Sequence, residues 1–143
     1  MPSEPKPVET RILIVEDDPF IAMDLEDAFT EAGYEVCGMA GTVAESLERI
    51  ERDAPGLATL DYHLGKETSE PVARALEARR IPYCFVSGNA DKLENPRAPV
   101  IQKPVAPGTV LRMLETLVAD TVRPAVDKSA GTTIAQAGIA AST

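Results

Sequence analysis

The stretch Arg11-Ile12-Leu13-Ile14-Val15-Glu16-Asp17-Asp18-Pro19, residues 11–19, decides the fold class. Residues 12–15 are apolar and mostly β-branched, which is typical of a strand buried on both faces of a parallel sheet. Three acids follow, and Asp18-Pro19 supplies a helix N-cap with a proline in the first turn. The stretch therefore predicts a strand that ends in a group of carboxylates and leads into a helix.

The same alternation of strand and helix continues along the chain. Five strands that alternate with helices indicate a doubly wound α/β fold around a five-stranded parallel sheet. Residues 89–95, after the fourth strand, leave room for only a turn or two, so the fourth helix is expected to be shortened or replaced by a loop. The other strands are expected at 34–39, 56–60, 81–86 and 99–102, and the other helices after Thr42, around Val72 and after Pro107.

Length and composition indicate one domain with short extensions. The chain has 143 residues, and domains commonly run to about 100–200. We expect a flexible N-terminal arm at residues 1–10, one domain at residues 11–122 and a flexible tail at residues 123–143. The tail is rich in small residues and buries too little apolar area to offset its ordering entropy.

Charge and hydropathy exclude several classes of partner. The 14 Lys and Arg residues stand against 23 Asp and Glu, a net charge of −9, which argues against binding the phosphates of nucleic acids. No apolar stretch approaches the roughly 18 residues that span a bilayer, and residues 1–10 lack the apolar core of a signal peptide. We therefore expect a cytoplasmic protein that does not contact the membrane.

The two cysteines, Cys37 and Cys84, lie inside apolar runs. They are too few for a disulfide scaffold and fit neither a CxxC motif nor a zinc site. We expect both to be small buried side chains.

Polar residues collect where the predicted strands end. Glu16-Asp17-Asp18 follow the first strand, Asp61 the third, Ser87 the fourth and Lys103 the fifth. In an open parallel sheet these ends surround the ligand crevice. Two carboxylates about 4 Å apart repel by roughly 4 kcal/mol at an effective dielectric of 20, so either one is protonated or a cation lies between them. Hard oxygen ligands open to solvent suit Mg²⁺, which predicts an acidic Mg²⁺ pocket that accepts a phosphoryl group.

These residues resemble the receiver domains of bacterial two-component response regulators. The resemblance covers about residues 11–120 and implies the flavodoxin-like fold of receivers. The interval between Ser87 and Lys103 is shorter than in the usual receiver. With the sequence of residues 99–104, it makes the chain similar to a subgroup of single-domain receivers, mainly from alphaproteobacteria, which implies a monomer or weak dimer. The matching segments are residues 12–18, 60–61, 85–88 and 102–104.

The resemblance assigns a role to each acid. Asp61 matches the aspartate that attacks a phosphohistidine and becomes an aspartyl phosphate, and an ionised carboxylate needs no base to do so. Asp17 corresponds to the direct Mg²⁺ ligand, and Glu16 to the acid that holds the ion mainly through water. The backbone carbonyl of His63, two residues after the acceptor, corresponds to the third ligand. Asp18 matches a variable position and is expected to cap the first helix.

Two further residues correspond to groups that bind the phosphoryl oxygens. Ser87 matches a hydroxyl that donates a hydrogen bond to one oxygen, and Lys103 matches a lysine that pairs with another. The Lys103–Pro104 bond corresponds to one that is cis in the family. Val100 departs from the pattern, because the family usually has Tyr or Phe three residues before the lysine, where it swings inward on phosphorylation.

The resemblance implies a stand-alone receiver that is a signalling protein and not an enzyme. It would take its phosphoryl group from a sensor histidine kinase or a phosphotransfer protein, and act by binding a downstream protein or by draining phosphate from a shared kinase. A receiver-like interaction module that is never phosphorylated stays open, because of Val100 and the short fourth helix. An Mg²⁺-dependent phosphatase would need a second acid where His63 stands, and a nucleotide or flavin domain would need a glycine-rich loop at residues 16–18.

Overall fold

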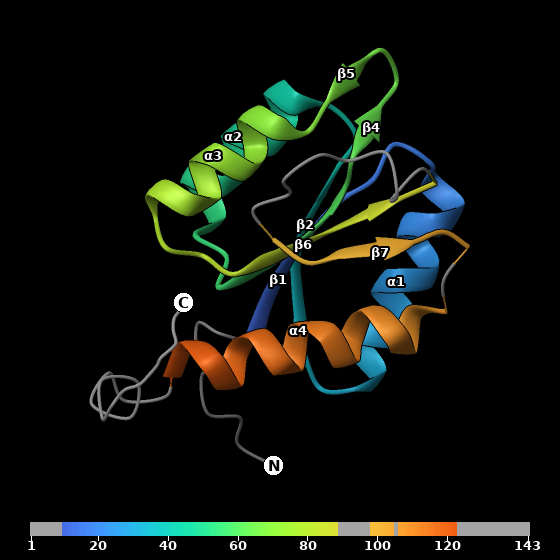
Figure 1. The fold of residues 1–143 in the computed structure, drawn as a ribbon, viewed down its shortest axis with the longest axis vertical. Helices are drawn as coiled ribbons and strands as arrows, with labels where there is room; N and C mark the ends of the chain where they lie inside the picture. Colours follow the sequence, from blue (N-terminus) through green and yellow to red (C-terminus); the bar gives the residue numbers. More distant parts are fainter. Residues whose placement is uncertain (1–9, 89–97, 105, 123–143) are drawn as a thin grey trace, which may run out of the picture.

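Strands and helices alternate along the chain in the computed structural model, which describes residues 10–88, 98–104 and 106–122. The alternation predicted from the sequence is confirmed. In chain order the elements are β1 (Arg11–Val15), α1 (Pro19–Glu31), β2 (Glu35–Ala40), α2 (Val43–Asp53), β3 (Leu57–Asp61), β4 (His63–Leu64), β5 (Glu67–Thr68), α3 (Glu70–Ala78), β6 (Tyr83–Ser87), β7 (Val100–Gln102) and α4 (Pro107–Val122) (Figure 1).

Five of the strands form one parallel sheet in the order β2-β1-β3-β6-β7. This is the predicted doubly wound α/β architecture. The chain leaves β1 toward β2 on one side and returns to β3 on the other, so the winding reverses between β1 and β3. In folds of this type, ligands bind at the carboxyl ends of the two strands that flank such a reversal.

Helices cover both faces of the sheet, with α1 and α4 on one face and α2 and α3 on the other (Figure 1). The strand β1 contributes to both cores: Ile12 and Ile14 pack with α1 and α4, whereas Leu13 and Val15 pack with α2 and α3. All four side chains are buried because successive residues of a strand point to opposite faces. This explains the unbroken apolar run at the start of the domain.

The predicted caps fix where the first two helices begin. Asp18 Oδ1 accepts hydrogen bonds from the backbone N–H groups of Phe20 at 2.9 Å and Ile21 at 3.4 Å. Thr42 Oγ1 accepts one from the N–H of Glu45 at 3.1 Å. These side chains satisfy backbone donors that have no partner inside the helix. The predicted cap role of Asp18 is confirmed, and the strand β1 therefore leads directly into α1.

Several details differ from the sequence prediction. The third and fourth strands extend one residue further than expected, so that Asp61 and Ser87 are their last residues. The two-stranded hairpin β4–β5 was not predicted, because each of its strands has only two residues. The shortened fourth helix was expected at 89–95, which lies outside the described residues, as does the tail at 123–143. Apart from Thr10, the predicted arm also lies outside them.

The two cysteines are free thiols. Cys84 is fully buried, as predicted, but Cys37 is only half-buried, because it lies on the edge strand β2. Its Sγ donates to the carbonyl oxygen of Ile12 at 3.5 Å. Among the described residues, every helix is too short or too polar to cross a membrane.

Candidate functional site

Three carboxylates meet at the carboxyl ends of β1 and β3. Glu16 and Asp17 directly follow β1, and Asp61 is the last residue of β3. One ligand atom from each of these acids lies within 4.8 Å of the others. Glu16 and Asp61 are buried, with 6% and 7% of their surface exposed, whereas Asp17 is exposed. The cluster is therefore sunk into the edge of the sheet and reaches solvent through Asp17.

Lys103 brings an ammonium group to the same cluster. Its Nζ lies 3.2 Å from Asp61 Oδ2 and 3.5 Å from Glu16 Oε1. The backbone N–H of Lys103 donates to the carbonyl of Ser87 at 2.8 Å, which continues the pairing of β6 with β7 beyond the end of β7. The Lys103–Pro104 peptide bond is cis, as in the family that the sequence resembles. One ammonium thus pairs with both buried carboxylates of the cluster.

Burial and the neighbouring charges shift the pKa values of Glu16 and Lys103. Burial raises the pKa of Glu16 to about 7, and its hydrogen bond with Asp61 and the repulsion from that acid act in the same direction. The N–H of Asp18 and the ammonium of Lys103 lower the pKa of Glu16, but they do not cancel the rise. For Lys103, partial burial lowers the pKa, and the attraction of Asp61 and Glu16 outweighs it, so that the pKa is raised.

The donor set fits Mg²⁺. The three acids offer only oxygen ligands, and the exposure of Asp17 leaves room for the waters that Mg²⁺ retains. Without a metal ion, the raised pKa of Glu16 favours its neutral, protonated form more than in an ordinary carboxyl group, chiefly because the group is buried. A divalent cation would remove the need for that proton. Glu16, Asp17 and Asp61 are therefore able to hold Mg²⁺ together.

Ser87 ends the strand β6, and His63 follows the carboxyl end of β3. Ser87 is buried at the end of β6, one residue beyond Val86, which pairs with Asp61. His63 begins β4 two residues after Asp61; its side chain is exposed and its ring meets Tyr62 edge-on at 5.0 Å. The roles expected for the Ser87 hydroxyl and the His63 carbonyl stay predictions.

A cavity adjoins the buried acids between α1 and α4. Its volume is about 420 Å³, and both acids line it. Glu16 and Asp61 therefore border this cavity on the side of α1 and α4. The remaining lining includes Lys103 and the apolar residues Ile21, Leu25, Val86 and Val110.

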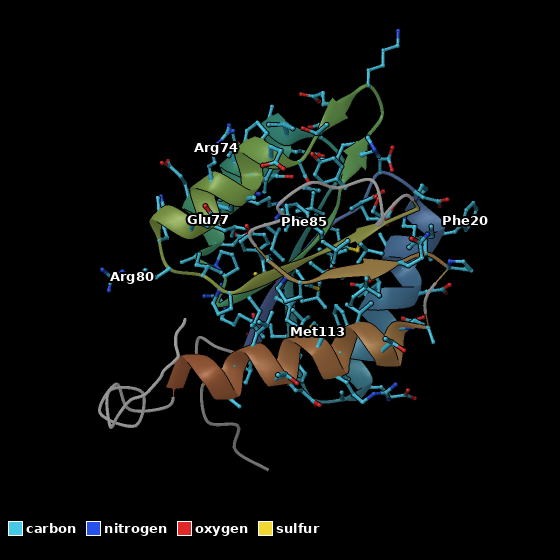
Figure 2. All side chains as sticks on the ribbon, in the orientation of Figure 1. Phe20, Arg74, Glu77, Arg80, Phe85 and Met113 are labelled. Atoms are coloured by element: carbon cyan, nitrogen blue, oxygen red, sulfur yellow. The ribbon has the colours of Figure 1, made fainter. Side chains whose placement is uncertain are left out.

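Val100 occupies the position where the family usually has an aromatic residue. It lies half-buried in β7 and pairs with Phe85 of β6. Phe85 is buried, with its ring edge-on to Tyr62 at 5.3 Å and to Tyr83 at 5.4 Å. Phe85 lies in the interior, whereas Phe20 projects from the start of α1 and is 77% exposed (Figure 2). Phe85, the partner of Val100 in the sheet, thus has the rings of Tyr62 and Tyr83 on its edges.

Sequence reasoning did not identify the contact that holds Asp17. The backbone N–H of Gly65, in the turn of the β4–β5 hairpin, donates to Asp17 Oδ2 at 2.9 Å. The available signal was a glycine followed by one residue between two short stretches, which is a hairpin turn sequence. Those stretches, at 63–64 and 67–68, were too short to be read as strands.

Comparison with known proteins identifies the family to which the chain belongs. No family model matches the chain. It is 41% identical to SdrG from Sphingomonas melonis Fr1, whose structure superposes with a TM-score of 0.69 over 79% of this chain and 99% of that one. It is also 31% identical to a CheY-like response regulator receiver domain protein from Methanospirillum hungatei, with a TM-score of 0.67 over 77% of this chain and 94% of that one. The chain belongs to the CheY-like receiver family of response regulators.

A longer relative is also similar to this receiver. The phyllosphere-induced regulator PhyR of Methylorubrum extorquens is 33% identical over 108 residues, or 71% of this chain. The chain spans only 40% of PhyR and 36% of the next curated relative it matches. The similarity therefore concerns only a part of each of these regulators. It confirms the family and the two-component type of protein that the sequence motifs indicated.

Proposed function

We propose that this receiver accepts a phosphoryl group on Asp61 from the phosphohistidine of a histidine kinase or a phosphotransfer protein. The observation that carries the proposal is the position of Asp61. Its carboxylate is buried at the end of β3, 3.2 Å from the ammonium of Lys103, and shares its surroundings with two further acids. A phosphoryl-accepting carboxylate needs compensating charge around it of this kind.

The transfer exchanges one bond to phosphorus for another. An oxygen of Asp61 forms a bond to phosphorus while the bond between phosphorus and the donor imidazole breaks. The imidazole nitrogen keeps the electron pair and takes a proton from solvent. Lys103 then pairs with a phosphoryl oxygen instead of the free carboxylate, and the Ser87 hydroxyl donates to another. Later attack of water on phosphorus returns Asp61 and releases inorganic phosphate.

Bound Mg²⁺ would neutralise charge that develops on the phosphoryl oxygens. Glu16, Asp17 and Asp61, with the backbone carbonyl of His63, would hold the ion. Glu16 would do so in its ionised form, which requires that the proton favoured by its raised pKa leaves when the cation binds. Lys103, which directly follows the edge strand β7, supplies the remaining positive charge.

In this proposal residues 11–122 form a signalling domain that is not an enzyme. Its output is a changed surface that binds a downstream protein, or the removal of phosphate from a shared kinase. The acidic net charge of −9 supports a protein partner and not a nucleic acid. Phe20 projects from the start of α1 (Figure 2), and Met23 is also exposed on this helix; both supply apolar surface for a phosphodonor. The protein itself is proposed to be a monomer or weak dimer.

The experiment uses phosphoramidate, whose phosphorus–nitrogen bond resembles that of phosphohistidine. Wild type, Asp61→Asn and Asp18→Asn are incubated with it, with and without Mg²⁺, and separated on a gel that retards phosphoproteins. Asp18→Asn is the matched control, because Asn caps a helix as well as Asp does. We expect an Mg²⁺-dependent retarded band in wild type and in Asp18→Asn, and none in Asp61→Asn. An equal band in Asp61→Asn would exclude Asp61 as the acceptor.

A further inference from the structure

The hairpin β4–β5 touches the proposed metal site through one hydrogen bond. Gly65 N–H donates to Asp17 Oδ2 at 2.9 Å. Glu16 and Asp61 are held by burial, but Asp17 is exposed, so packing does not fix its carboxylate. The bond from Gly65 is therefore a restraint on the one acid of the cluster that faces solvent.

The rest of the hairpin is anchored, which makes this restraint effective. Leu64 is 3% exposed and packs into the core beneath α2 and α3. At the base of the hairpin, the N–H of Ser69 donates to the carbonyl of Tyr62 at 2.8 Å. The turn needs a left-handed residue, and Gly65 has φ +63°. The position of the Gly65 amide is thus fixed by the burial of Leu64 and by the hydrogen bond between Ser69 and Tyr62 that closes the hairpin.

We propose that the Gly65 amide is a positioning group for the metal ligand Asp17, and that it couples the β4–β5 hairpin to occupation of the metal site. This inference rests on the proposed Mg²⁺ site. A carboxylate has two oxygens, so Oδ2 accepts the amide while the other oxygen stays available to the cation. Hydrogen-bond partners of metal ligands commonly change metal affinity by about 10–100-fold.

The coupling acts in both directions. If the ordered hairpin favours Mg²⁺ at Asp17, then Mg²⁺ at Asp17 favours the ordered hairpin by the same factor. The hairpin protrudes beside α2 and α3 (Figure 1), and His63, Lys66 and Glu67 are exposed on it. Binding of Mg²⁺ at the partly buried site would therefore make the exposed β4–β5 hairpin more ordered.

The test measures the dissociation constant of Mg²⁺ from amide chemical shifts of the full chain, in wild type and three variants. Both Gly65 variants keep the backbone N–H. Gly65→Val places a β-branched residue at positive φ and is expected to displace the turn, whereas Asn tolerates that conformation. A Cβ atom at residue 65 would meet no other atom within 4 Å, so the strain of Gly65→Val comes from the backbone conformation. Gly33→Val imposes the same kind of strain at φ +96°, also in open space, at the end of α1.

We expect Gly65→Val to weaken Mg²⁺ binding about tenfold, and Gly65→Asn and Gly33→Val to leave it unchanged. In wild type, Mg²⁺ should also slow hydrogen exchange of the Gly65 amide, a readout that needs no variant. Saturable binding that Gly65→Val leaves unchanged, or exchange that Mg²⁺ does not slow, would overturn the coupling while leaving the metal site intact. Absence of any Mg²⁺-dependent shift in wild type would overturn both proposals.

Discussion

Lys103 Nζ lies 3.2 Å from Asp61 Oδ2, although β6 separates their strands in the sheet. The same ammonium lies 3.5 Å from Glu16 Oε1, at the end of β1. One cation from an edge strand thus compensates acids from the two strands that flank the reversal of winding. This arrangement makes the stability of the metal-free protein depend on a residue that the proposed function assigns to the phosphoryl group.

Replacement of Lys103 by methionine is expected to destabilise the metal-free protein by about 2 kcal/mol, because it leaves buried acids without their cation. Denaturant unfolding measures the change. Mg²⁺ should recover part of the loss in Lys103→Met, since it neutralises the same acids. Lys66→Met, on the exposed hairpin, is the control and should change the stability by less than about 0.5 kcal/mol. Equal effects of the two variants would contradict this account of Lys103.

The raised pKa of Glu16 predicts an unusual dependence of stability on pH. The folded protein binds this proton more tightly than the unfolded chain, with a pKa of about 7 instead of 4.5. The contribution to stability is therefore complete below pH 4.5 and is lost as the pH rises toward and through 7, by roughly 3 kcal/mol in all. Unfolding by urea in EDTA measures it. Glu16→Gln should flatten the profile in this range, and an unchanged slope would contradict the shift.

The core beneath α4 offers a test of the fold. Leu114 is fully buried and packs with α1 against the sheet. Leu114→Ala is expected to cost about 2–5 kcal/mol of unfolding free energy, through lost burial and the cavity it leaves. Met23 is 52% exposed on α1, and Met23→Ala should be nearly neutral. A neutral Leu114→Ala would show that α4 does not complete the core.

The two cysteines are expected to differ in reactivity. Burial raises the pKa of Cys84 to about 12, against a weak opposing effect of its hydrogen bond with Thr59, so almost no thiolate forms at neutral pH. The pKa of the half-buried Cys37 is also raised, chiefly by burial. Titration with a thiol-specific disulfide reagent at pH 8 should label Cys37 slowly and Cys84 only on unfolding. Rapid labelling of Cys37→Ser before unfolding would contradict the burial of Cys84.

The same shift of Cys84 also acts on stability. Because the folded pKa lies above the unfolded value of about 9, the contribution of the neutral thiol is complete below pH 9 and is lost as the pH rises toward 12. Cys84→Ala should reduce this alkaline loss, which thermal unfolding at a series of pH values measures. A steeper alkaline loss in Cys84→Ala would contradict the assignment.

Most of the fold could be predicted because its signals are local. The run 12–15 is buried on both faces, Asp18 and Thr42 cap helices, and each produces a pattern within a few residues. Alternation of strand and helix then limits the topology to a parallel sheet. The hairpin β4–β5 could not be predicted in this way, since four paired residues show no periodicity and depend on the tertiary contacts of Leu64 and Gly65.

The candidate site could also be predicted from the sequence only in part. The placement of Glu16, Asp17 and Asp61 follows from the rule that carboxyl ends of parallel strands meet at one edge. The distances from Lys103 to Asp61 and Glu16 do not follow from it, because they depend on the conformation after β7. Likewise, the sequence shows that residue 100 is a valine and not an aromatic residue. Only the structure shows that Val100 pairs with Phe85, whose ring contacts the ring of Tyr62.

The central claim is that Asp61 carries the phosphoryl group, and localisation of the modified residue tests it most directly. The protein is incubated with acetyl phosphate and Mg²⁺, treated with borohydride, which reduces an aspartyl phosphate to homoserine, and digested for tandem mass spectrometry. The account predicts homoserine at residue 61 in wild type only when Mg²⁺ is present. Homoserine at Asp17 or Asp18 instead, or an equal yield at residue 61 without Mg²⁺, would contradict it.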